Sequence, residues 1–238
     1  MATKAVKKQD DQLPAYIKQG AGRGNENVTS DDIQIPRISV LQALSPQIKK
    51  SDPEYIEGAE QGIIFNVLTG ELYPDGIQFV PVFFEKDHLV WKTRKSGGGL
   101  IARCASAQEA QALANSDDTY EYVEAPNHIC ILLKSDGTPD CEVSIPMPTS
   151  KQKVSRRLNS LIRLNQGDRF SRVYKLLAVE DESPSGEYWN LAVENVGFPQ
   201  EEAYLAAEVL YDSITSGAKK YSTDYSDSQE GSEKAAEY

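Results

Sequence analysis

The stretch TSKQKVSRRLNSLIRLNQG, residues 149–167, carries the most regular helical pattern in the chain. Its apolar residues recur at the i, i+4, i+7 and i+8 positions that share one helix face, namely Val154, Leu158, Leu161 and Ile162. At about 100° per residue, four cations fall on the opposite face: Lys153, Arg156, Arg157 and Arg163. Thr149 and Gln152 stand in capping-box spacing, and Gly167 follows the last apolar residue. The pattern predicts a helix that is held by its apolar stripe and presents a row of cations to solvent.

Segments with high β-propensity lie on both sides of this helix, and turn residues join most of them into pairs. Thr69-Gly70, residues 135–138 and residues 182–186 each separate two such segments, which predicts three hairpins. The expected strands span residues 63–68, 71–73, 78–84, 88–93, 128–134, 141–145, 169–179 and 188–196, with 88–93 pairing with 78–84, and shorter helices are expected at 106–114 and 200–213. Because strands and helices are mixed rather than strictly alternating, the predicted class is α+β. It has a mainly antiparallel β-sheet or a partly open barrel, with three or four helices.

Composition divides the chain into three parts. Residues 1–30 are polar and contain a glycine-rich stretch, so they are expected to form a disordered N-terminal arm. Residues 31–217 are expected to form a single α+β binding domain, since this length can bury a sizeable core. Residues 218–238 are rich in Ser, Asp, Glu and Tyr and are expected to form a disordered acidic tail.

The same composition disfavours several classes of protein. No apolar run approaches the roughly 18 residues that a transmembrane helix needs, so no membrane association is expected. The N-terminus has lysines but lacks the apolar stretch of a secretory signal. The cysteines, Cys104, Cys130 and Cys141, form no C-x-x-C motif, which favours a reducing cytoplasm. With only two histidines, His88 and His128, the sequence predicts no metal site and no cofactor.

Charge is distributed unevenly along the chain. The net charge is -11, yet residues 1–175 hold 22 basic and 22 acidic side chains, so the whole excess of acid lies in residues 176–238. Within the neutral part, residues 151–175 contain a single acid, Asp168, and eight cations: Lys151, Lys153, Arg156, Arg157, Arg163, Arg169, Arg172 and Lys175. This distribution suits a protein that binds a polyanion and carries its own competing polyanion. A solvated basic helix beside an acidic surface is the alternative interpretation.

Signatures of common catalytic sites are absent. The chain has no G-x-S-x-G elbow, no P-loop and no H-E-x-x-H. Pro74-Asp75 and Pro139-Asp140 match the first half of a common nuclease signature, but no lysine has an acid two residues before it. We therefore expect no enzymatic activity, and a metal-dependent nuclease built from scattered carboxylates ranks third among the functions considered.

Two groups of cations stand beside aromatic residues, which is the composition of a groove for single-stranded nucleic acid. Cations compensate phosphates and flat rings stack on bases, although each ring also fits a protein core. No helix-turn-helix or zinc finger indicates readout of duplex DNA. The candidate nucleic-acid-binding residues are Phe84, Trp91, Lys92, Arg94, Lys95, Lys151, Lys153, Arg156, Arg157, Arg163, Arg169, Arg172 and Tyr174.

Several motifs in the first hundred residues resemble a family of tailed-bacteriophage proteins. They are Asn25-Glu26-Asn27-Val28, Ile35-Pro36-Arg37-Ile38, Leu41-Gln42-Ala43-Leu44-Ser45-Pro46, Thr69-Gly70-Glu71 and Gly97-Gly98-Gly99. The overall layout, a β-rich core followed by an acidic tail that ends in Tyr238, resembles phage single-stranded DNA-binding proteins. This likeness implies single-stranded DNA as a partner, replication or transcription proteins as partners of the tail, and a place in the host cytoplasm.

We therefore expect a non-catalytic single-stranded DNA-binding protein of bacteriophage type, acting in replication, recombination or early transcription. The alternative from another class is a phage virion or assembly protein without a nucleic-acid role. A homo-oligomer is compatible with the first function, because strand binders gain affinity by multivalency.

Overall fold

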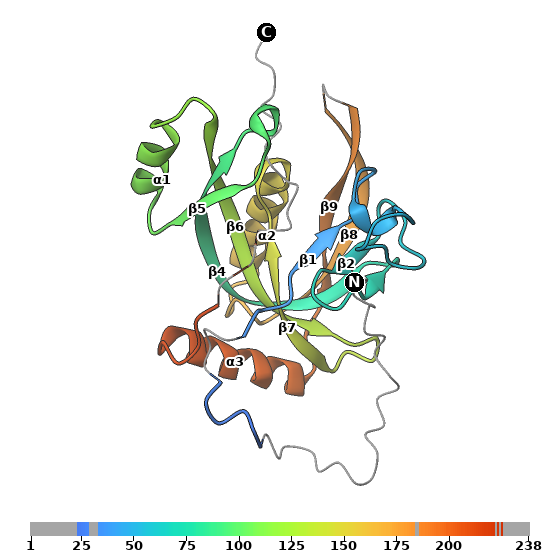
Figure 1. Cartoon of the computed structure of the whole chain (residues 1–238). Coiled ribbons are helices and arrows are strands. Elements are labelled where there is room, and N and C mark those ends of the chain that lie inside the picture. Colours follow the sequence, from blue (N-terminus) through green and yellow to red (C-terminus); the bar gives the residue numbers. More distant parts are fainter. Residues whose placement is uncertain (1–22, 29–32, 184–185, 222, 224, 226–238) are drawn as a thin grey trace.

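The computed structural model describes residues 23–28, 33–183, 186–221, 223 and 225 (Figure 1). Its strands are β1 (Ile38–Val40), β2 (Ile64–Asn66), β3 (Leu72–Tyr73), β4 (Ile77–Lys92), β5 (Leu100–Cys104), β6 (Tyr120–Leu133), β7 (Pro139–Pro146), β8 (Val173–Ser183) and β9 (Gly186–Gly197). Its α-helices are α1 (Ala107–Ala114), α2 (Gln152–Leu164) and α3 (Glu201–Thr215), and short 3-10 turns cover Pro46–Ile48 (η2), Arg94–Ser96 (η3) and Thr149–Lys151 (η4).

Two antiparallel sheets make up the β-structure. The larger has the order β7-β6-β4-β8-β9, with β5 paired to the far half of β4, and the smaller has the order β1-β2-β3. Strand β1 packs against both β7 and β9, the two edge strands of the larger sheet, and an isolated parallel bridge joins Arg37 to Ser144. The small sheet thus spans part of the gap between the edges. This arrangement confirms the predicted α+β class with mainly antiparallel strands.

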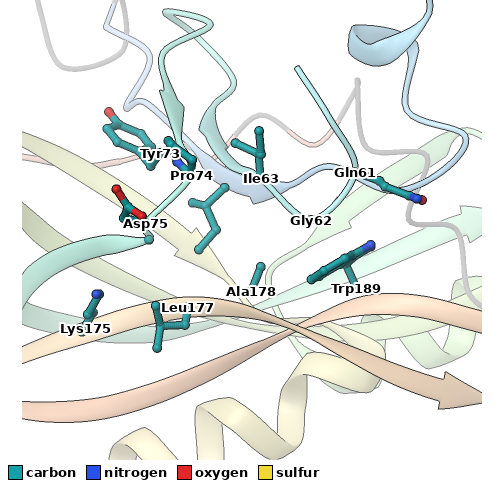
Figure 2. Close-up of a pocket in the computed structure, with 12 residues that line it drawn as sticks. Gln61, Gly62, Ile63, Tyr73, Pro74, Asp75, Lys175, Leu177, Ala178 and Trp189 are labelled. Carbon is teal, nitrogen blue, oxygen red and sulfur yellow. The ribbon is translucent and has the colours of Figure 1, made fainter. Parts of the chain in front are cut away.

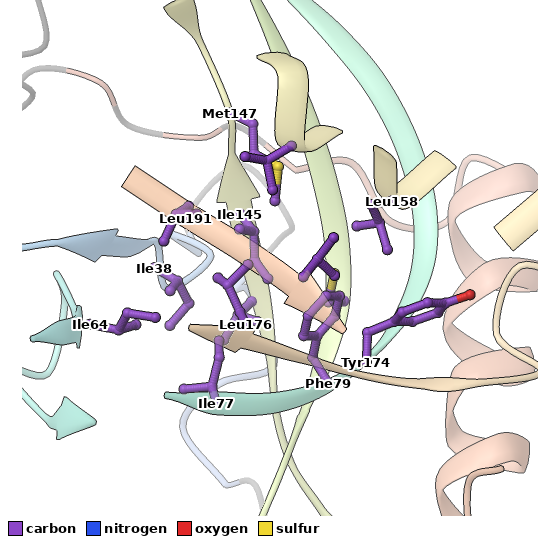
Figure 3. Packing of buried hydrophobic residues seen from close by; sticks show 14 of the residues in the cluster. Ile38, Ile64, Ile77, Phe79, Ile145, Met147, Leu158, Tyr174, Leu176 and Leu191 are labelled. Atoms are coloured by element: carbon purple, nitrogen blue, oxygen red, sulfur yellow. The ribbon is translucent and has the colours of Figure 1, made fainter. Parts of the chain in front are cut away.

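Alternation along the central strands gives the large sheet two buried faces. Phe79 and Leu132 point to the side of α2, where they join the main core, and Val80 and Ile131 point to the side of α3. Helix α1 covers the other end of β4 and β6, so α1 and α3 lie at opposite ends of these two strands (Figure 1). The main core, shown in part in Figure 3, packs α2 against the larger sheet through Val154, Leu158 and Ile162.

Local signals placed most elements correctly. The hairpins β2–β3, β6–β7 and β8–β9 occur where turn residues predicted them. Helix α1 starts at its predicted cap, since the Glu109 backbone N–H donates to Ser106 Oγ at 3.2 Å. Helix α2 lacks its predicted cap: Thr149 adopts a φ of 48° in the turn η4, and no side chain caps either helical turn.

The predicted pair of strands at 78–84 and 88–93 is instead one continuous strand, so that expectation is wrong. Strand β4 pairs with β6 from Gln78, opposite Leu133, to Lys92, opposite Tyr120. Residues 85–87 are Glu-Lys-Asp, a polar run that contains no glycine or proline and continues the strand. Asp87 is buried there because Arg103 of β5 pairs with its carboxylate at 2.5 Å.

The folded domain extends past its expected end at residue 217. Lys219 forms an ion pair with Glu142 at 2.6 Å, and Thr223 Oγ1 lies 2.9 Å from the Asn127 Nδ2 donor. Tyr225 is buried, and its hydroxyl donates to Asp87 at 2.6 Å. The polar composition after residue 217 suggested a free tail, but Lys219, Thr223 and Tyr225, at odd-numbered positions, contact the folded domain. Residues 226–238, like most of the expected N-terminal arm, lie outside the described residues.

Candidate nucleic-acid interface

The cations of α2 form an exposed row, as the helical pattern predicted. Lys153, Arg156, Arg157 and Arg163 are exposed, whereas Val154, Leu158 and Ile162 on the other face are buried. None of Arg156, Arg157 and Arg163 forms an ion pair with any residue that the structure describes. The helix therefore offers three arginine side chains whose charges no carboxylate of the described chain neutralises.

Arg169 extends this row from the loop that follows α2. Its Nη1 donates to Asn159 Oδ1 at 2.9 Å, and Asn159 lies on α2 three residues after Arg156 and four before Arg163. Residues at these spacings share one helix face, so Arg169 is held beside Arg156 and Arg163. The guanidinium also lies over the Phe84 ring, 5.4 Å from the centroid.

The partners of Arg169 are all neutral. Its Nη2 donates to His128 Nδ1 at 2.7 Å, so His128 accepts at Nδ1 and donates from Nε2 to Ser155 Oγ at 2.8 Å. Burial, reinforced by the charge of Arg169, holds the pKa of His128 well below its usual range. Arg169 Nε is buried without a hydrogen-bond partner among the described residues. The site thus holds a half-buried cation that no anion among the described residues compensates.

A second arginine–aromatic pair joins the residue before β8 to the segment before α3. The Arg172 guanidinium carbon lies 3.6 Å from the centroid of the Phe198 ring, which is 75% exposed. Burial raises the pKa of Tyr174, and the charges of Arg172 and Arg169 oppose this rise in part. Phe198 was not among the predicted binding residues, because a lone aromatic before a helix gives no sequence signal for stacking.

The other predicted residues divide into core residues and a separate loop. Trp91 is only 3% exposed and Tyr174 is fully buried, so neither ring is accessible to a base. Lys151 is also buried, and Phe84 is half-buried against the His128 ring. Lys92 ends β4, and Arg94 and Lys95 lie in η3. No hydrogen bond or ion pair between described residues joins Lys92 or Lys95 to α2.

The described residues outside this interface contain no cluster of metal-ligating or nucleophilic side chains. Among the described residues, no three His, Cys, Asp or Glu side chains are grouped as a metal ion would require. Cys104 and Cys130 are free and buried, and burial raises the pKa of both thiols, which disfavours the reactive thiolate. The His128–Ser155 contact is sealed from solvent, because both residues are almost fully buried.

Comparison with known proteins places the chain in a phage family. The family model described as Pam3 phage gp34-like protein matches residues 6–220. The chain belongs to this family. The resemblance to bacteriophage proteins predicted from its first hundred residues is thereby confirmed at the level of a phage family. No curated protein and no solved structure matches the chain. No helix among the described residues of this phage-family protein is long and apolar enough to cross a membrane.

Proposed function

We propose that this Pam3 phage gp34-like protein binds single-stranded DNA in the host cytoplasm, without catalysis, during replication, recombination or early transcription. The observation that carries the proposal is the row formed by Arg156, Arg157 and Arg163 on the exposed face of α2, unpaired with any carboxylate of the described chain. Neutral-partnered Arg169 continues the row. We call these four side chains the arginine row.

A phosphate backbone supplies the counter-charge that the arginine row lacks. Arginine forks match phosphate oxygens, and α2 holds them on a rigid element because its apolar stripe is anchored in the core. Release of condensed counterions then favours binding in a salt-dependent way. The exposed Phe198 ring beside Arg172 adds a flat surface on which an unpaired base can stack, which favours a single strand over a duplex.

Fluorescence anisotropy with labelled oligo-dT tests the proposal. We expect the triple variant Arg156→Glu, Arg157→Glu, Arg163→Glu to lose binding while its circular dichroism spectrum stays native. A matched control reverses three exposed lysines away from α2, Lys49, Lys50 and Lys134, and has the same net charge. The control is expected to retain most of the affinity, because bulk charge repels the strand only weakly at moderate salt.

Salt dependence gives a second readout of the same site. For the wild-type protein, the slope of log affinity against log salt is expected to be about -0.7 for each phosphate contacted. Equal loss of affinity in the triple variant and in the lysine control would show that net charge, not the arginine row, governs binding. Wild-type affinity in the triple variant would remove the site from α2 altogether.

A further inference from the structure

A cavity of about 450 Å³ lies where the small sheet meets the β8–β9 hairpin (Figure 2). One wall is the Trp189 indole of β9, and Leu177 and Ala178 of β8 add apolar surface. Gly62, before β2, and Asp75, in the turn between β3 and β4, contribute the remaining walls. Volumes of about 300–1,000 Å³ are typical of small-molecule sites, so the cavity has room for one nucleotide-sized group.

The Trp189 ring is held in place from two sides. Gln42 clamps its main chain, since Gln42 Oε1 accepts from the Trp189 N–H at 2.9 Å and Gln42 Nε2 donates to the Trp189 carbonyl at 2.7 Å. Gly62 has a φ of +84°, and a Cβ at this position would lie 2.7 Å from three atoms of the indole. The backbone therefore packs directly on the ring, which fixes the orientation of the aromatic wall before any ligand arrives.

The rim of the cavity carries opposite charges. Gly76 brings the turn that holds Asp75 tightly against β8, because a Cβ at Gly76 would lie 2.3 Å from the Leu176 carbonyl oxygen. Asp75 is exposed and Lys175 is half-buried, and neither forms an ion pair with another described residue. The Asp75 carboxylate can accept hydrogen bonds from ring N–H groups, and the Lys175 ammonium can contact a phosphate. Together they suit a ligand that has a planar heterocycle with N–H donors and an attached phosphate.

The cavity and the arginine row belong to opposite faces of the same hairpin. Tyr188 and Asn190, which flank Trp189 on β9, both donate to Asp181. These hydrogen bonds, led by the one from Asn190, lower the pKa of Asp181, and Lys153 of α2 lowers it further. Because side chains alternate along a strand, Trp189 points the other way, and Figure 2 shows the yellow α2 on the far side of the hairpin from the cavity.

We infer that this cavity receives one base of the bound strand at a site separate from the arginine row, with the Trp189 indole as its aromatic wall. This inference rests on the proposed function. The ligand class is a nucleobase with its attached phosphate: the ring contacts Trp189, its N–H edge faces Asp75, and its phosphate contacts Lys175.

Quenching of tryptophan emission tests the inference directly. The chain has two tryptophans, and Trp91 is buried, so a ligand in the cavity alters the emission of Trp189. We expect oligo-dT to quench the emission, and an abasic strand of equal length and charge to leave it unchanged. In the Trp189→Leu variant, which removes the aromatic ring, the quenching is lost and oligo-dT affinity falls about tenfold, as base stacking contributes about 1–3 kcal/mol per base. Affinity for the abasic strand stays the same.

Lys175→Gln is a second variant that leaves the core intact. It is expected to keep the quenching and to reduce the salt slope by about 0.7, the value for one phosphate. If anisotropy shows that oligo-dT binds but Trp189 emission does not change, the cavity inference is overturned while the proposed function stands. If no strand binds at all, the proposed function fails, and millimolar thymidine monophosphate decides the cavity alone. With this monophosphate, whose single phosphate has no other contact to hold it, quenching in the wild type that weakens in Lys175→Gln supports a nucleotide site, and unchanged wild-type emission rejects it.

Discussion

Replacing Leu158 by alanine removes a side chain at the centre of the surface that anchors α2. Leu158 is fully buried and belongs to the main core together with Phe79 and Tyr174, as Figure 3 shows. Surrounding strands are hydrogen-bonded on both sides and cannot collapse into the space left behind. The loss is therefore expected near the middle of the range for core leucines, about 3–4 kcal/mol of unfolding free energy. For a chain of this size, that lowers Tm by about 10 °C.

Leu164→Ala on the same helix is the matched control. Leu164 is 76% exposed, so the same change of side chain is expected to shift the unfolding free energy by less than about 0.5 kcal/mol. Urea unfolding followed by circular dichroism measures both variants, and an unchanged m-value verifies that they unfold from equally compact states. Similar destabilisation in the two variants, or a loss below about 1 kcal/mol in Leu158→Ala, would refute the placement of the apolar stripe. The arginine row would then lose its structural basis.

Three further predictions concern pH, the C-terminal contacts and the tail. Because burial keeps His128 neutral in the folded state, only the unfolded chain takes up its proton near the ordinary pKa, and stability falls as pH drops below that value. In His128→Gln, the free energy of unfolding from urea titrations is expected to vary less between pH 7 and 5, by up to about 1.4 kcal/mol per pH unit. Equal pH profiles of the variant and the wild type would contradict the assigned protonation state. Tyr225→Phe removes the hydrogen bond to Asp87 and is expected to cost about 1.5–3 kcal/mol in urea unfolding, whereas Tyr211→Phe, at an exposed hydroxyl, leaves stability unchanged. Deleting residues 226–238 removes four carboxylates and one lysine, so anisotropy at low salt is expected to show tighter oligo-dT binding, with the gain shrinking as salt rises; weaker binding would mean that this segment contributes to the interface.

The parts of the fold that sequence reasoning recovered are those encoded within a few neighbouring residues. The spacing of the apolar residues in α2 predicted its buried face, and the turn residues predicted three hairpins. The long strand β4 was missed because its polar middle resembles a turn in composition. Asp87 is tolerated there only because Arg103 and Tyr225, 16 and 138 residues away, supply its partners. Such distant compensation leaves no local signal.

In the candidate site, too, only the residues that a local sequence pattern describes were predicted correctly. Arg156, Arg157 and Arg163 were predicted correctly as exposed, because helix periodicity separates them from the core. For aromatic residues, the alternation along a strand gives two faces but does not say which is covered. Trp91 is covered by a cluster that includes Tyr225, a residue expected in a free tail. Trp189 lines a cavity whose opposite wall lies more than a hundred residues earlier in the chain.

The clamp between Gln42 and Trp189 has a consequence for how the chain folds. The two residues are 147 positions apart, so the small sheet cannot join the β9 edge until nearly four-fifths of the chain has emerged from the ribosome. Contacts of such high sequence separation carry a large loop-closure cost and slow the search for the native state. Until then, the small sheet has no contact with β9, and the strand edges that this contact would cover are exposed and prone to aggregate. We expect closure of this contact to be a late step in folding, so yield during rapid expression in a host should depend on temperature more than the equilibrium stability does.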